Sequence, residues 1–262
     1  MTARMPVVFF GHGSPLIALE QNATTASWRA IAESMPRPKA ILCISAHWVT
    51  RGAHTTGQSQ PPTIHDFGGF PQAMFEIQYP ARGDLGLVRR VAELAAPHRI
   101  QPSSDWGYDH GCWSVLMKAW PEADVPVVQL SLDVDRSARS HFELGRRLQP
   151  LRDEGVLIMG TGNAVHNLRA MVRAPGVPAH PHATAFSNRI WSAVVEDDTE
   201  AVVGYETLGE MARWSLPTPE HFWPLLYVLG ARHSDDQPTL STQYIEYGSV
   251  DMTTLVLRPP AA

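Results

Sequence analysis

The feature that most constrains the fold is a short apolar run that stops at a histidine set between two glycines. Residues 7–10 are Val-Val-Phe-Phe, which are β-prone, and Pro15 shortly afterwards blocks any regular continuation. The pattern predicts a buried strand that presents His12 at its carboxyl end. Ligands of open α/β sheets bind outside the carboxyl ends of the strands, so His12 lies where a site is expected.

Two further apolar runs end in a similar way. Residues 40–46 lead into His47, and residues 156–159 lead into a Gly-Thr-Gly-Asn turn with His166 close behind. The carboxyl ends of parallel strands share one edge of a sheet. We therefore expect these histidines to approach the same site.

Helical patterns separate the strands and predict an α/β fold. A helix over 25–34 joins the first two strands, and this β-α-β unit favours a parallel pair. We expect one domain over residues 1–262, with a mostly parallel central sheet flanked by helices and a metal site at the carboxyl ends of its strands. The remaining predicted helices cover 83–97, 114–120, 137–151 and 183–195, and the remaining strands 125–132, 242–247 and 253–257.

Residues 50–80 form a long irregular stretch rich in proline, glycine and aromatic residues. Loops of this length inside a compact domain are usually functional or disordered, and the aromatic content argues against disorder. We therefore expect the stretch to be a loop that covers the site.

Charge and composition exclude several classes of partner. The net charge is -5 and no cluster of Lys or Arg forms a basic footprint, so no nucleic-acid partner is expected. No segment approaches the roughly 20 apolar residues of a membrane span. Two cysteines and the absence of a signal-peptide core predict a cytoplasmic protein. No pattern indicates an oligomeric state.

Histidine is plentiful, at 12 residues, and three of them are candidate metal ligands. Transition metals favour imidazole nitrogen, and open catalytic sites commonly have three protein ligands. His12 and His47 end strands, while Thr218 and Pro219 predict a helix start that puts His221 in its first turn. Each histidine alone is consistent with a core or turn residue; their joint placement favours a metal site.

Two more histidines are candidates for catalysis. His166 titrates near neutral pH when unperturbed, which suits a general acid-base; the alternatives are a fourth metal ligand or a packing role. His110 lies between Asp109 and Gly111, where it suits hydrogen bonding to substrate or oxygen, or a plain turn. The other histidines are predicted to be structural or surface residues, namely His54, His65, His98, His141, His180, His182 and His233.

Five motifs, in order along nearly the whole chain, resemble those of the class III extradiol ring-cleavage dioxygenases of the LigB-like superfamily. Within that superfamily the chain is most similar to the bacterial and plant 4,5-DOPA dioxygenase subgroup. Five motifs in one order are far more specific than any one of them. They are Gly11-His12-Gly13-Ser14-Pro15, Ser45-Ala46-His47-Trp48, Asp109-His110-Gly111-x-Trp113, Gly160-x-Gly162-Asn163-x-x-His166-Asn167-Leu168 and Glu220-His221-Phe222-x-Pro224-Leu225.

The resemblance implies a mononuclear non-haem iron(II) site, which zinc(II) often occupies in purified protein. It matches His12, His47 and His221 to the metal ligands, His166 to an acid-base histidine sometimes drawn as a fourth ligand, and His110 to a substrate-facing one. The implied partners are a catechol such as L-DOPA and O2, and the implied product is a muconic semialdehyde. Cys112 departs from the pattern, which favours a smaller or less oxidisable residue there.

Two other functions fit the same residues. One is a zinc-dependent hydrolase in which metal-bound hydroxide attacks an ester or amide. The other is a metal-binding interaction protein of the same superfamily without catalysis. Four side chains are candidates for pairing with a substrate carboxylate, and the spacing does not select among them: Arg51, Arg82, Arg213 and His182.

Overall fold

The computed structural model describes residues 4–174 and 176–260, and its centre is a sheet of eight strands within that range. The strand order is β4-β3-β5-β2-β6-β1-β10-β7. The four central strands run parallel, and they are β5 (Val127–Asp133), β2 (Ala40–Thr50), β6 (Val156–Gly162) and β1 (Val7–Gly11). The predicted α/β fold with a mostly parallel central sheet is therefore confirmed.

Antiparallel pairings appear toward both edges of the sheet. On one side, β3 (Ala53–Thr56) is antiparallel to β5 and parallel to β4 (Ile100–Ser103). On the other side, β10 (Thr254–Arg258) runs antiparallel to both β1 and β7 (Gln237–Ser241). A separate two-stranded hairpin joins β8 (Ile245–Glu246) to β9 (Val250–Asp251).

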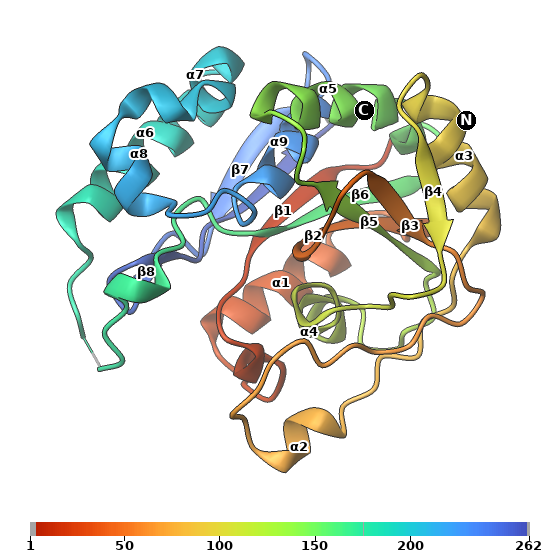
Figure 1. The fold of residues 1–262 in the computed structure, drawn as a ribbon, viewed down its shortest axis with the longest axis horizontal. Coiled ribbons are helices and arrows are strands. Elements are labelled where there is room, and N and C mark those ends of the chain that lie inside the picture. Colours follow the sequence, from red (N-terminus) through yellow and green to blue (C-terminus); the bar gives the residue numbers. More distant parts are fainter. Residues whose placement is uncertain (1–3, 175, 261–262) are drawn as a thin grey trace.

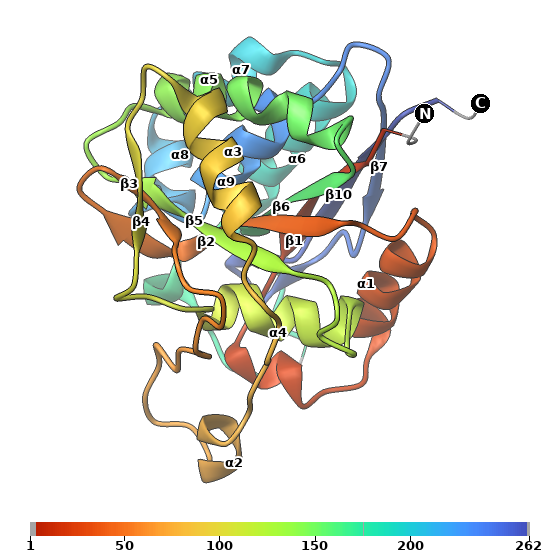
Figure 2. The same cartoon turned by 90° about the vertical axis from the view of Figure 1, so that its right-hand side faces the viewer.

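Helices cover both faces of the sheet. Figure 2 shows α1 (Ala23–Glu33) and α4 (His110–Ala119) on one face, with α3 (Leu85–Ala95), α5 (Ala138–Leu148) and α9 (Trp223–Gly230) on the other. Figure 1 shows a further group beside α9, formed by α6 (Pro181–Val195), α7 (Thr199–Val203) and α8 (Glu210–Ser215). The short helices are α2 (Gln72–Phe75), η1 (Pro15–Ala18), η2 (Gln149–Arg152), η3 (Leu168–Ala170) and η4 (Tyr205–Leu208).

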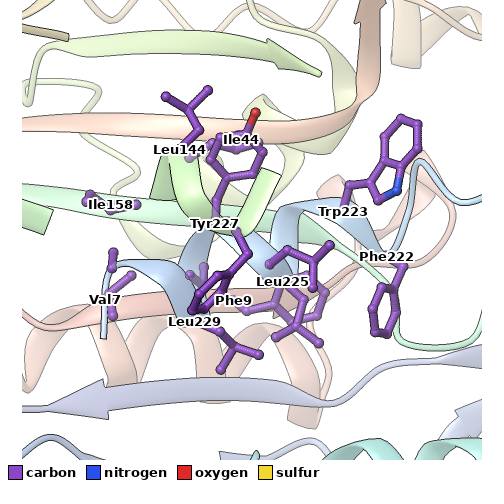
Figure 3. Close-up of a cluster of buried hydrophobic side chains, with 14 of the residues drawn as sticks. Val7, Phe9, Ile44, Leu144, Ile158, Phe222, Trp223, Leu225, Tyr227 and Leu229 are labelled. Atoms are coloured by element: carbon purple, nitrogen blue, oxygen red, sulfur yellow. The ribbon is translucent and has the colours of Figure 1, made fainter. Parts of the chain in front are cut away.

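The alternation of side chains along β1 divides the core into two layers. Val7 and Phe9 belong to the layer under α5 and α9, while Val8 and Phe10 belong to the layer under α1 and α4. A strand buried on both faces reads as a continuous apolar run, which is why residues 7–10 show no polar alternation. Figure 3 shows Leu225 and Leu229 of α9 gathered against β1, where each buried leucine stabilises the fold by about 2 kcal/mol.

Strand pairing corrects the prediction for the opening β-α-β unit. β1 and β2 are parallel, but they do not pair, because β6 lies between them. Val8 of β1 faces Met159 of β6, and Leu42 of β2 faces Ile158. As a result, the three strands that end near a histidine are consecutive in the sheet, with β6 in the middle.

Several predicted boundaries near the site are wrong. The helix predicted from residue 114 begins at His110, because the Asp109 side chain accepts a hydrogen bond from the backbone N of Cys112 and caps it. The strand predicted over 242–247 is reduced to Ile245–Glu246, since Thr242 and Tyr247 both adopt positive φ angles of 50° and 51°. Across the described residues, no helix is both long and apolar enough to cross a membrane.

Candidate active site

Three histidines meet at the carboxyl edge of the parallel strands. His12 follows β1, His47 lies in β2, and His221 comes two residues before α9. One ring nitrogen from each lies within 4.8 Å of the others. The Nε2 atoms of His12 and His47 are 3.0 Å apart. The structure thus brings together the three residues that the sequence predicts as metal ligands.

Close packing of β1 fixes the position of His12. Gly11 pairs with Gly162 of β6, and the backbone N of His12 donates to the Gly162 carbonyl over 3.2 Å. A Cβ atom at Gly11 would lie 2.5 Å from the carbonyl carbon of Met252, which is too close for any other residue. The glycine before His12 is therefore required by backbone contact.

Asn163 links two of the histidine segments. Its side-chain Nδ2 donates to the His12 carbonyl over 2.7 Å and to the Asp251 carbonyl over 2.8 Å, and its backbone N donates to the His221 carbonyl over 2.8 Å. A Cβ atom on Gly162 would lie 2.1 Å from that same His221 carbonyl. The Gly-x-Gly-Asn turn therefore positions His12 and His221 through their backbones.

His47 is placed by an irregularity in β2. The register of β2 against β5 shifts between Ile44 and Val49, and such bulges re-aim side chains near active sites. Within the irregular part, the Ser45 hydroxyl accepts a hydrogen bond from the His47 backbone N over 3.2 Å. The same hydroxyl donates to the buried carboxylate of Asp109 over 2.7 Å, which connects β2 to the start of α4.

The expected helical position of His221 is wrong. The α9 helix begins at Trp223 with Phe222 as its N-cap, so His221 lies in the turn before the helix. Pro224 occupies the first turn of α9, which is the place where a proline is tolerated. The Nδ1 atom of His221 lies 3.2 Å from Oε1 of Glu220.

Electrostatics favour neutral imidazoles in this cluster. Burial is the main cause that lowers the pKa of His12, His47 and His221 well below the usual value, and the neighbouring histidines add to the shift. Neutral rings offer lone pairs to a metal. His12 Nδ1 is also buried without a hydrogen-bond partner among the described residues. Three neutral nitrogens that face one another fit a transition-metal ion, although imidazole suits iron, zinc and copper alike.

Asp66 is a site residue that the sequence reasoning missed. Its Oδ2 atom lies 2.8 Å from His110 Nδ1 and 3.6 Å from His47 Nδ1, and its Oδ1 accepts from the His110 backbone N over 2.8 Å. Burial alone raises the pKa of Asp66, but the hydrogen bonds and charge of His110 lower it overall. The sequence feature that could have identified Asp66 is its position as a carboxylate in the loop predicted to cover the site.

Two other groups also have metal-ligand spacing. They are His47, Asp66 and His110, and His166, Glu220 and His221. In the first group the Asp66 carboxylate is already hydrogen-bonded to His110, so its lone pairs have a partner. In the group of His12, His47 and His221, by contrast, all three ligand atoms are imidazole nitrogens, and those of His12 and His47 lie 3.0 Å apart.

His166 lies beside the cluster, in contact with His221. Their rings stack with centroids 3.4 Å apart, and the His166 backbone N donates to the Ser215 carbonyl over 2.9 Å. Burial lowers the pKa of His166 to about 4, with a smaller contribution from His110. A ring nitrogen of His166 lies within 4.8 Å of a Glu220 carboxylate oxygen and a His221 nitrogen, but His166 does not join the group that contains His12 and His47. Its acid-base and fourth-ligand roles remain predictions.

The histidines line a cavity of about 430 Å³. His12, His47, His110, His166 and His221 all contribute to its wall. The loop predicted to cover the site supplies Phe67 and Phe70. Its remaining charged lining residues among those described are Arg173 and Glu246; Arg51, Arg82, Arg213 and His182 do not line it.

Cys112 is a core residue. It is fully buried, like Cys43, and both thiols are free. Burial, followed by the neighbouring Cys43, raises the pKa of the Cys112 thiol well above its usual value. A protonated, enclosed thiol is a poor nucleophile, so Cys112 is suited to packing.

Known proteins are similar to this chain over nearly its whole length. A family model described as the catalytic LigB subunit of aromatic ring-opening dioxygenase matches residues 8–257. The 4,5-DOPA dioxygenase extradiol of Escherichia coli (strain K12) is 46% identical over 260 residues, covering 97% of this chain and 95% of that protein. A protein of the same name from Beta vulgaris is 35% identical over 258 residues, with coverages of 94% and 96%.

A solved structure agrees with the fold. The crystal structure of an uncharacterized Escherichia coli K12 protein superimposes with a TM-score of 0.85 at 40% sequence identity. The match covers 97% of this chain and 100% of the other. The overall fold is therefore shared with an experimentally solved protein.

Proposed function

The chain belongs to the LigB family of aromatic ring-opening dioxygenases, and from that membership we propose that it cleaves a catechol such as L-DOPA in the extradiol position. The reaction consumes O2, breaks the ring bond beside the two hydroxyls and gives a muconic semialdehyde. The observation that carries the proposal is the group of facing nitrogens of His12, His47 and His221 in the wall of the cavity.

We propose that these three histidines hold iron(II), with zinc(II) as an alternative occupant. Neutral imidazoles leave the full charge of the ion in place, which favours binding of an anionic catecholate in an enclosed cavity. When bound, iron(II) supplies the Lewis-acid and redox chemistry that an aromatic ring needs to react with O2.

The surrounding side chains have separate proposed roles. His166 is neutral and borders the cavity, so it accepts a proton from a catechol hydroxyl and returns it later in the reaction. His110, oriented by Asp66, presents its ring to the substrate oxygens. Phe67 and Phe70 close the cavity from the loop side and limit the access of water.

We also propose a cytoplasmic location. Cys43 and Cys112 are free thiols in the core, which is consistent with a reducing compartment. Fractionation of the source cells tests this proposal, and recovery of the protein outside the cytoplasm would contradict it.

Oxygen uptake is the direct test of the reaction. The protein is stripped of metal, reconstituted anaerobically with iron(II) or with zinc(II), and supplied with L-DOPA and a panel of other catechols. We expect stoichiometric O2 consumption and a yellow ring-opened product with iron(II) alone. Ester or amide hydrolysis by the zinc(II) form, without O2 uptake by either, would favour a hydrolase. Failure to bind any catechol would favour a metal-binding interaction protein.

A further inference from the structure

The cavity wall carries two opposite charges that the reaction at the histidines does not use. Glu246 in β8 and Arg173 in the segment after η3 both line the cavity. Neither side chain forms an ion pair or a side-chain hydrogen bond with another described residue. Charged groups without partners on a ligand-cavity wall are suited to bind charged groups of the ligand.

Glu246 lies close to the histidine cluster. Its Oε2 atom is 2.8 Å from the position that a Cβ atom would take on Gly13, the residue after His12. The carboxylate therefore packs against the backbone of Gly13, next to His12. The side chain is partly buried, so a cation that enters the cavity meets this charge with reduced solvent screening.

Backbone pairing holds Arg173 next to the hairpin that carries Glu246. The backbone N of Val172 donates to the carbonyl of Tyr247 over 3.1 Å. Arg173 directly follows the donor residue, and Glu246 directly precedes the acceptor residue. The Arg173 side chain is exposed, so it lies toward the open side of the cavity. Glu246 and Arg173 thus occupy an inner and an outer position on the wall.

The hairpin tip adopts an uncommon backbone conformation. Tyr247 has a φ of 51° and Gly248 a φ of 78°. A non-glycine residue in the left-handed region is strained, and such strain is concentrated at functional sites. Here the conformation ends β8 directly after Glu246 and leaves Tyr247 on the cavity wall, with its carbonyl bonded to the residue before Arg173.

From these contacts we propose that Glu246 binds the ammonium group and Arg173 the carboxylate of a catechol amino acid whose ring lies against the histidines. This specificity proposal rests on the proposed ring-opening function. An α-amino acid presents one positive and one negative group at its end remote from the ring, which matches the two charges on the wall. The cavity volume of about 430 Å³ lies in the range of about 300–1,000 Å³ that is typical for small-molecule sites.

The test compares four catechols that differ in the side chain on the ring. L-DOPA carries both charges, dopamine only the ammonium, dihydrocaffeate only the carboxylate, and unsubstituted catechol neither. The variants are Glu246→Gln and Arg173→Met. Glu122→Gln and Arg169→Met are matched controls, because both native residues are exposed and neither lines the cavity.

We expect each variant to change selectivity for one charge. Glu246→Gln lowers kcat/KM for L-DOPA and dopamine, relative to catechol, by roughly tenfold, and Arg173→Met does the same for L-DOPA and dihydrocaffeate; this is the scale of one lost charge-assisted hydrogen bond. The control variants keep the wild-type ratios. Equal losses for catechol and L-DOPA in both variants, or unchanged ratios, would overturn the proposal.

A binding measurement separates this proposal from the reaction itself. Anaerobic calorimetric titration of the zinc-loaded protein with L-DOPA and with catechol reports affinity without turnover. If no catechol is consumed but L-DOPA binds more tightly and loses that advantage in the variants, the end-group proposal stands and the ring-opening proposal fails. Turnover of catechol with no preference for L-DOPA in rate or affinity would support the ring-opening proposal and refute the end-group proposal.

Discussion

The imidazole rings of His166 and His221 lie parallel, with planes 8° apart and centroids 3.4 Å apart. One ring belongs to the proposed metal-ligand group and the other borders the cavity from the turn after β6. The contact fixes where the proposed proton acceptor stands relative to the proposed ligands. It depends on two turns that are more than fifty residues apart in the chain.

Replacing His166 by alanine tests its acid-base role. We expect turnover to fall by roughly 100-fold or more, because the proton of the substrate hydroxyl loses its acceptor, while metal content stays unchanged. Metal analysis and oxygen uptake on the same sample measure both effects, with His182→Ala, outside the cavity, as the control. Normal turnover with metal retained would exclude the role, and loss of metal would favour a ligand role instead.

Asp66→Asn tests whether the carboxylate orients His110. The variant keeps the shape of the side chain but removes the charge that faces His110 Nδ1. We expect kcat or metal affinity to fall by roughly 10- to 100-fold, as for other outer carboxylates that orient site histidines. Asp105→Asn, in the exposed part of a neighbouring loop, serves as the control. Wild-type kinetics for Asp66→Asn would show that Asp66 has no orienting role.

Asn163→Ala tests the backbone link between His12 and Asp251. Two carbonyls lose their buried donor, and each unsatisfied polar group costs about 1–3 kcal/mol. The summed loss of about 2–6 kcal/mol corresponds, in a chain of this size, to a fall in Tm of roughly 4–24 °C, measured by thermal unfolding of the metal-free protein. Asn163→Asp is expected to lower Tm at least as much, because a carboxylate oxygen replaces the Nδ2 donor and cannot donate to either carbonyl. An unchanged Tm in both variants would contradict the assigned hydrogen bonds.

The stability of the metal-free protein is expected to decrease in mild acid. Burial, with a smaller effect of Arg136, lowers the pKa of His141 to about 4, whereas the unfolded chain has an ordinary value near 6.5. Between these values the unfolded state binds a proton that the folded state does not. The free energy of unfolding therefore falls as pH decreases from about 6.5 to 4, by up to about 3 kcal/mol for this residue.

Denaturant unfolding at several pH values measures this contribution. His141→Asn retains a polar partner for the Tyr227 hydroxyl, which lies 3.1 Å from His141 Nδ1, but carries no titrating ring. We expect a shallower decline of the unfolding free energy with falling pH than in the wild type. The variant His182→Asn, at a half-buried site outside the cavity, is the reference. The same decline in His141→Asn as in the wild type would refute the assignment.

Much of the fold and part of the site follow from local sequence patterns. Uninterrupted apolar runs at 7–10, 40–46 and 156–159 reveal strands, because a strand buried on both faces must be apolar at every position. The residues that stop those runs identify His12 and His47, and the order of the five motifs identifies the family, which the comparisons confirm. The roles of the individual histidines remain predictions.

Only the tertiary structure decided which side chains meet. The insertion of β6 between β1 and β2, the approach of Asp66 to His110, and the positions of Glu246 and Arg173 on the cavity wall depend on strand order and loop paths. Sequence periodicity reports whether a residue is buried within its own element. It carries no information on which distant element packs against that residue, because that choice is set by the packing of the whole chain.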